Sequence, residues 1–170
     1  MSEVTIRPLE ETDAYTSVRW RNIPELWTYT AFKANRKITI QDELDWIKKV
    51  IKDPTSVRFA IVVDGVYVGN TYLTDISNGI AEYHIFIGEK EYWGKGVARK
   101  ATVLTISYGK DKLKLHTITL NVKPENKAAF HLYDTMGFTQ IGKDEGGGFT
   151  TMRIDLAGWT GDPRDKIKQL

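Results

Sequence analysis

Apolar positions recur along the chain with two periods, and the period changes at glycine-containing turns. Runs of β-branched and aromatic residues that alternate or continue predict strands, whereas apolar residues spaced three or four apart predict helices. The expected strands cover residues 4–8, 58–64, 66–74, 81–87, 116–122, 138–144 and 149–156. The expected helices cover two short stretches within 12–27, followed by 40–52, 97–108 and 126–136. This order predicts a mixed α/β fold.

Turn and cap residues indicate how these elements connect. Asp64-Gly65 suits a type I′ turn and predicts a hairpin between its flanking runs. Ser77-Asn78-Gly79 turns the chain again, so the next run extends an antiparallel meander. Thr39 and Asp42 resemble a capping box at the start of the helix that follows them, and Gly137 is placed to end the helix before it.

Length and composition fit one domain over residues 1–158 with a polar C-terminal tail at 159–170. The chain has no cysteine, which excludes a disulfide framework and a thiol nucleophile. A net charge of +2 from well-mixed residues argues against a nucleic-acid partner. With no apolar run of about 20 residues and no leader pattern, we expect a cytoplasmic protein without a membrane partner. No metal site is expected, because three scattered histidines form no metal motif: His84, His116 and His131.

A glycine-containing turn lies between the strand ending near Ile87 and the helix beginning near Val97. Such a turn exposes unpaired backbone N–H groups at the positive end of the helix dipole, which favours an anion such as phosphate. The same helix start carries the basic residues Lys95, Arg99 and Lys100. A bound polyanion would explain these cations, and the alternative is a plain turn with solvated cations.

The blocks from Gly94 to Ala98 and from Asn121 to Phe138 together resemble the GCN5-related N-acetyltransferase (GNAT) family. Gly94-Lys95-Gly96-Val97-Ala98 is similar to its pyrophosphate loop, Gln/Arg-x-x-Gly-x-Gly/Ala, although Glu91 stands at the Gln/Arg position. The block from Asn121 to Phe138 resembles its pantetheine-binding strand and following helix, and ends in the usual Tyr-x-x-x-Gly-Phe. The resemblance extends to Leu156 and is strongest to the branch of ribosomal-protein N-terminal, polyamine and amino-sugar acetyltransferases.

The resemblance implies the GNAT fold, a mostly antiparallel mixed sheet of about seven strands flanked by about four helices. It also implies acetyl-CoA as co-substrate. Phe86 and Ile87 would offer main-chain groups to the pantetheine arm, and Asn121 and Asn126 would hold and orient the cofactor. The pyrophosphate would be cradled by Trp93, Gly94, Lys95, Gly96, Val97, Ala98 and Arg99.

Acetyl transfer from a thioester to an amine requires a neutral amine, a polarised carbonyl and a proton for the thiolate. Direct attack in a ternary complex needs no cysteine. Tyr133 matches the family's tyrosine that protonates or hydrogen-bonds the coenzyme A sulfur, and the competing interpretation is a buried packing residue. Strand alternation places Glu82, His84 and Phe86 on one face. Glu82 is then a candidate base, with His84 a competing base or orienting partner, unless both are merely exposed.

The resemblance places the acceptor amine beside residues 19–37, where five basic residues face a single acid, Glu25. This balance favours an acceptor with a phosphate or carboxylate, such as an amino sugar, over a polyamine. A peptide N-terminus is another acceptor of the family. The alternatives are a polyamine acetyltransferase and a non-catalytic acyl-CoA-binding sensor or scaffold. A homodimer also stays open, because exposed edges of such sheets often pair.

Overall fold

A computed structural model describes residues 2–144 and 146–167 of the chain. Seven strands are formed: β1 (Val4–Pro8), β2 (Val57–Val63), β3 (Val66–Ser77), β4 (Ile80–Ile87), β5 (Thr117–Val122), β6 (Thr139–Lys143) and β7 (Thr150–Asp155). The α-helices are α1 (Ala14–Arg21), α2 (Ile40–Ile51), α3 (Val97–Asp111), α4 (Lys127–Met136) and α5 (Pro163–Ile167). Three 3₁₀ turns lie at Glu11–Asp13, Pro24–Trp27 and Lys90–Tyr92.

The strands form a single mixed sheet in the order β1-β2-β3-β4-β5-β7-β6. β4 and β5 run parallel, while the other described neighbours run antiparallel. α3 connects these two parallel strands, because a parallel pair needs a crossover that a tight turn cannot provide. The seven-stranded, mostly antiparallel sheet expected from the sequence is therefore confirmed.

Local signals in the sequence determine several element boundaries. Asp64 and Gly65 have φ values of 48° and 84°, as a type I′ turn requires at both central positions. At the start of α2, Thr39 Oγ1 accepts a hydrogen bond from the Asp42 N–H, and the Asp42 carboxylate accepts one from the Thr39 N–H. Gly137 ends α4 with φ 113°, in the left-handed region that favours glycine.

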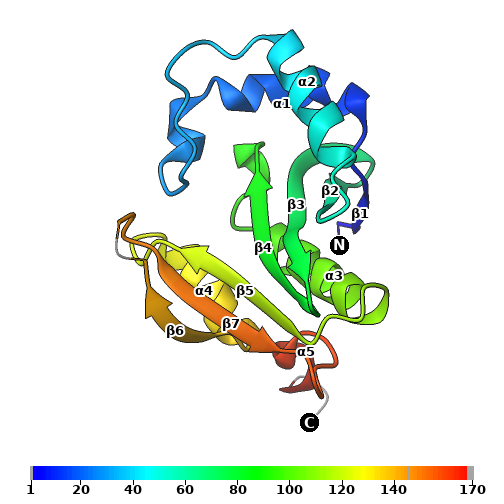
Figure 1. Cartoon of the computed structure of the whole chain (residues 1–170), viewed down its shortest axis with the longest axis vertical. Helices are drawn as coiled ribbons and strands as arrows, with labels where there is room; N and C mark the ends of the chain where they lie inside the picture. Colours follow the sequence, from blue (N-terminus) through cyan, green and yellow to red (C-terminus); the bar gives the residue numbers. More distant parts are fainter. Residues whose placement is uncertain (1, 145, 168–170) are drawn as a thin grey trace.

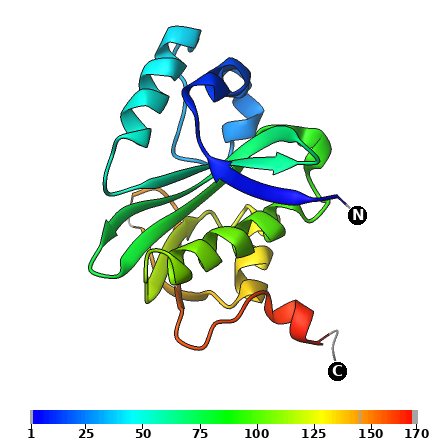
Figure 2. The same cartoon turned by 90° about the vertical axis from the view of Figure 1, so that its right-hand side faces the viewer.

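Helices cover both faces of the sheet (Figures 1 and 2). α1 and α2 lie over one face of its N-terminal half, whereas α3 and α4 lie on the opposite face. Beneath α4, Leu120, Met136 and Met152 belong to the largest apolar cluster, with at most 1% of each exposed. The face beyond the reach of α1 and α2 is open over β5 and β7, where Asn121 and Arg153 are exposed.

The sheet opens between its two parallel strands. β4 and β5 pair only from Ile80↔Thr117 to Glu82↔Thr119, near the start of each strand. Beyond Glu82 the two strands diverge into a V, which is visible at the centre of Figure 1. Main-chain groups of β4 and β5 past this point do not pair with each other, so the opening starts at Glu82.

The C-terminal segment packs on the body of the protein. Trp159 packs against the largest apolar cluster, and the half-buried Arg99 pairs with buried Asp162 at 3.0 Å. Trp159 and Asp162 are thus packed residues in a segment that was expected, from its polar composition, to be a peripheral tail. Residues 168–170 of that tail lie outside the described residues.

Candidate active site

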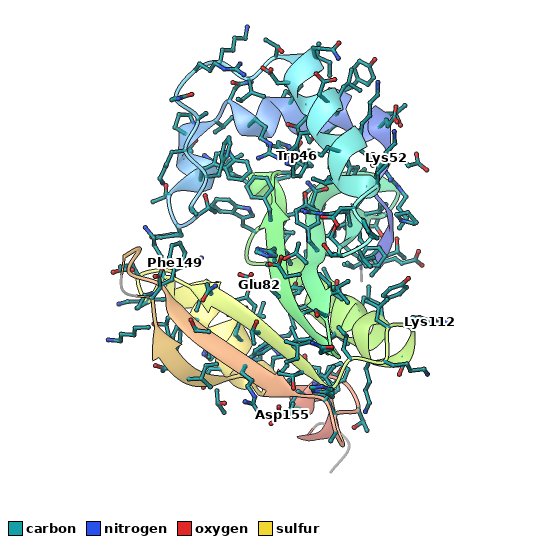
Figure 3. The ribbon with its side chains drawn as sticks, in the orientation of Figure 1. Trp46, Lys52, Glu82, Lys112, Phe149 and Asp155 are labelled. Atoms are coloured by element: carbon teal, nitrogen blue, oxygen red, sulfur yellow. The ribbon has the colours of Figure 1, made fainter. Side chains whose placement is uncertain are left out.

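The open end of β4 presents the two predicted proton acceptors on one face. Glu82, His84 and Phe86 alternate with buried Ala81 and Tyr83, as the period of a strand requires. Phe86 stacks on a ring from the N-terminal half, so these side chains lie on the face covered by α1 and α2. Figure 3 shows Glu82 at the V between β4 and β5.

A chain of polar side chains crosses the V at Glu82. Asn121 Nδ2 donates to Glu82 Oε1 at 3.0 Å, and Thr151 Oγ1 donates to Asn121 Oδ1 at 2.7 Å. On the other side, His84 Nε2 lies 3.8 Å from Glu82 Oε1 and 3.0 Å from Thr74 Oγ1. The structure therefore brings Glu82, His84 and Asn121 together, and it engages the Asn121 side chain with protein groups.

The surroundings of His84 affect its protonation, although 44% of its side chain is exposed. Desolvation lowers the pKa of His84 below its ordinary value of 6.5, and the positive charge of Arg58 acts in the same direction. Glu82 and Asp75 oppose this shift because their negative charges favour the imidazolium. His84 is consequently neutral at pH 7 and able to accept a proton.

Tyr133 lies beneath the sheet on α4. Its ring packs edge-on against Tyr83 of β4 and against Phe138, with centroids 6.2 and 5.7 Å away. Burial raises the pKa of its phenol well above the ordinary value of 10. Tyr83 donates or accepts a hydrogen bond with Thr102, whereas no described residue pairs with the Tyr133 hydroxyl. A phenol held in its protonated form acts as a hydrogen-bond donor and acid, not as a base.

The glycine turn adopts a conformation suited to an anion. Gly94 and Gly96 have φ values of 71° and 80°, and Gly96 is the N-cap of α3. No atom lies within 4 Å of where a Cβ would sit on either glycine, so the turn is open on that side. The free N–H groups of the first turn of α3 therefore point out of the fold at the positive end of the helix.

The side chains around this turn contact different parts of the protein. Arg99 turns away to Asp162 and Thr135, and the Val97 side chain is 3% exposed in the core, so both retain only main-chain groups for a ligand. Lys95 lies over the Tyr92 ring at 6.0 Å. The half-exposed indole of Trp93 donates to the carbonyl of Ile87 at 3.1 Å, which occupies one main-chain group expected to serve the pantetheine arm.

Two further predicted residues have structural partners of their own. Asn126 is the N-cap of α4, where its side chain accepts a hydrogen bond from the Ala129 N–H at 3.4 Å. Phe86 stacks on Trp27 with centroids 4.2 Å apart, and its ring lines a cavity below α1 and α2. The Ala98 side chain lies in the first turn of α3 and is half-buried.

An aromatic cavity of about 100 Å³ opens next to Phe86. It is lined by Ser17, Trp20, Arg21, Trp27, Glu43, Trp46, Asn70, Tyr72 and Phe86. Arg21 lies over the Trp27, Phe32 and Trp46 rings, at 4.4–5.1 Å from their centroids. The Arg21 guanidinium pairs with buried Glu43 at 3.0 Å, so this cage already contains a neutralised cation.

Most of the positive charge expected along residues 19–37 is compensated in space. Arg19 pairs with Glu89 and Arg36 with Asp42, both at 2.7 Å, while Lys33 donates to backbone carbonyls. Arg21 is paired with Glu43 as described above. The charge argument for an anionic acceptor therefore does not hold for this segment, because acids distant in the sequence lie beside its arginines.

Residues that sequence reasoning missed surround the predicted ones. Thr74 and Thr151 hold the ends of the polar chain, and the Arg21–Glu43 pair with Trp46 forms the cavity wall. Arg58 of β2 lies over Tyr72, and its isolation in an otherwise apolar strand was a readable signal. Among the described residues, no group of three or more acidic, His or Cys side chains is placed to bind a metal, and no helix could span a membrane.

The fold, the V in the sheet and the glycine turn at a helix N-terminus are the features expected of an acyltransferase that uses a nucleotide-containing cofactor. Comparison with known proteins identifies the family, because residues 3–139 match the model of the acetyltransferase (GNAT) domain. The chain therefore belongs to the GNAT family and is an acetyl-CoA-dependent N-acetyltransferase. This outcome confirms the family and the reaction class expected from the sequence.

Individual relatives match most of the chain in sequence, and one of them in structure. A spermidine N(1)-acetyltransferase from Escherichia coli K12 is 32% identical over 145 residues, covering 82% of this chain and 75% of the relative. The acetyltransferase PseH from Campylobacter jejuni is 24% identical over 127 residues, covering 75% and 77%. The Vibrio cholerae spermidine N-acetyltransferase, solved with CoA and spermine, superposes with a TM-score of 0.81 at 27% identity, covering 92% and 97%.

Proposed function

We propose that this protein binds acetyl-CoA in the V between β4 and β5 and transfers the acetyl group to a primary amine on the α1/α2 side of the sheet. The observation that carries this proposal is that three features lie around the open end of β4. The unpaired strand edges begin at Glu82, the open glycine turn lies at the N-terminus of α3, and Tyr133 lies beneath β4. A solved relative described as a complex with CoA supports the choice of cofactor.

In this proposal the glycine turn binds the pyrophosphate through main-chain N–H groups. Gly94 to Ala98 supply these groups, and Lys95 adds a charge that no described carboxylate pairs with. Arg99 contributes main chain only, since its guanidinium binds Asp162. The pantetheine arm then enters the V, where Phe86 and Ile87 present main chain on one side and Asn126 lies at the start of α4 on the other.

The proposed chemistry uses groups on the two faces of the sheet at the V. Tyr133, protonated because it is buried, donates to the sulfur as the thiolate leaves. Glu82 and neutral His84, on the opposite face, take up the proton that the attacking amine loses. Asn121 fixes the Glu82 carboxylate by donating to it, and Thr151 fixes the Asn121 amide in the orientation that makes this possible.

A second candidate names a polyamine as the acceptor. The E. coli and V. cholerae relatives, 32% and 33% identical, are spermidine N(1)-acetyltransferases. Another relative, PseH, is named only as an acetyltransferase, so the relatives do not all point to a polyamine.

Thiol release from acetyl-CoA in the presence of primary amines tests the proposed function. Tyr133→Phe should lower kcat roughly 100-fold and leave the affinity for acetyl-CoA nearly unchanged, because it removes only the donor to the sulfur. Tyr83→Phe is the matched control, since it deletes a buried hydroxyl that already has a hydrogen-bond partner in Thr102. Equal turnover of wild type and Tyr133→Phe would remove Tyr133 from the mechanism.

A further inference from the structure

Arg58 is an isolated charge within an apolar strand. Its neighbours in β2 include Phe59, Ala60 and Ile61, each at most 5% exposed, and it is the only charged residue of that strand. The guanidinium lies 4.3 Å from the Tyr72 ring centroid and 5.7 Å from that of Trp46. Arg58 is thus half-buried under α2, on the face that carries the proposed acceptor site.

No carboxylate of the described residues lies within 4 Å of Arg58. Four other arginines in the same half of the chain have such partners: Arg7, Arg19, Arg21 and Arg36. The Arg58 Nε instead donates to Ser56 Oγ at 3.4 Å, and Asp53 acts on it only at a distance. Burial lowers the pKa of Arg58, in keeping with a partly desolvated cation that lacks a counter-charge.

The register of the sheet aligns Arg58 with the proposed proton acceptors. Arg58 pairs with Tyr72 across β2 and β3, and Tyr72 pairs with His84 across β3 and β4. Cross-strand partners share a face, so the three side chains form a row. Two strand spacings separate the ends of this row, about 10 Å between backbones. Tyr72 stands between the two ends of the row and also lines the aromatic cavity, so an acceptor that reaches both ends would lie across its ring.

From this row we propose that the acceptor amine carries a phosphate or carboxylate that pairs with Arg58 while its amino group faces Glu82 and His84. This inference rests on the proposed function and names the substrate class of that site. Arg21 cannot take this role, because Glu43 already neutralises it at 3.0 Å. Arg58 is therefore a specificity-determining residue, and a polyamine would place a second cation beside it.

Matched acceptor pairs test the proposal in a thiol-release assay with acetyl-CoA. Glucosamine 6-phosphate is compared with glucosamine, and lysine with cadaverine, so that each pair differs by one anionic group; spermidine completes the set. The wild-type protein is expected to show kcat/KM at least tenfold higher for the anionic member of a pair. An advantage in the sugar pair alone identifies phosphate, and one in the lysine pair alone identifies carboxylate.

Substitution of Arg58 separates recognition from folding. Arg58→Gln should abolish the advantage by raising KM for the anionic acceptor at least tenfold, while KM for glucosamine and for cadaverine changes much less. Arg58→Lys keeps the charge and should retain part of the advantage. Arg36→Gln, which removes an exposed arginine paired with Asp42, is the control and should leave the ratio intact.

Three outcomes would overturn the inference. The first is preference of the wild type for spermidine or cadaverine, and the second is an unchanged anionic advantage in Arg58→Gln. Both leave the proposed function standing, because an amine is still acetylated. The third is an absence of thiol release with all five amines, which defeats the proposed function and this inference with it.

Discussion

At the scale of single residues, the site depends on groups whose ionisation the fold adjusts in opposite directions. Burial raises the pKa of Tyr133 and desolvation lowers that of His84, so in the proposed mechanism Tyr133 donates to the sulfur and His84 accepts a proton. Tyr133 and His84 lie on opposite faces of the sheet, which separates the proposed acid from the proposed base. Glu82 accepts a hydrogen bond from Asn121 of the neighbouring strand, and the role of this asparagine toward the cofactor stays a prediction.

The pH dependence of activity tests the role of His84. Because its pKa lies below 6.5, the acid limb of the kcat/KM profile should lie below pH 6.5 and activity should rise with pH as His84 loses its proton. In His84→Gln the limb should move by about 1 unit or more to lower pH, since a carboxylate is then the remaining acceptor. A limb that stays in place in this variant would assign it to another group. Thr151→Val, which disturbs the Asn121–Glu82 contact without removing His84, tests whether Glu82 contributes to the limb.

Residue-level prediction succeeded where a strand or helix period places a side chain. Alternation placed Glu82 and His84 on one face, and helical spacing placed Tyr133 at the buried surface of α4. It failed for contacts between elements, because Thr151 reaches Asn121 across 30 residues and Asn121 reaches Glu82 across 39. Such pairings depend on strand order, and the order β5-β7-β6 cannot be read from local spacing.

At the scale of elements, tight turns and caps were predictable, and irregular features were not. The type I′ turn, the Thr39 capping box and the Gly137 cap each depend on a few adjacent residues. β3 extends three residues beyond the expected end at 74, through a register shift between Thr74 and Ser77. Asp75 has φ 51° there, and an Asp in the left-handed region leaves little signal in a sequence.

Gly88 joins β4 to the N-terminal helices through close packing. A Cβ at this position would lie 2.1 Å from Cδ2 of Trp20, whose side chain is 1% exposed. Gly88→Ala should therefore displace Trp20, which lines the cavity and donates to Glu89, and destabilise the protein by roughly 1–3 kcal/mol. Urea unfolding measures this loss. Gly142→Ala on β6, with no atom within 4 Å of the added Cβ, should be nearly neutral, and equal losses would contradict the packing argument.

At the scale of the whole molecule, the sheet holds its two halves together at only three pairs of residues between β4 and β5. α3 and the C-terminal segment reinforce this junction, because Arg99 of α3 binds Asp162 and Lys110 of α3 donates to the carbonyl of Trp159. The polar composition of residues 159–170 gave no indication of these contacts. Composition predicts average exposure, and it does not identify which single aspartate is buried against an arginine.

A ligand that fills the V should stabilise this weak junction and with it the whole fold. At 100 times its dissociation constant, acetyl-CoA should add about 2.7 kcal/mol to the free energy of unfolding. For a chain of this length that corresponds to a rise in Tm of roughly 5–10 °C. Thermal unfolding with acetyl-CoA, and with ATP and NAD as controls, measures the shift. A rise specific to acetyl-CoA supports binding between β4 and β5, and no rise at millimolar acetyl-CoA would mean that the glycine turn is only a turn.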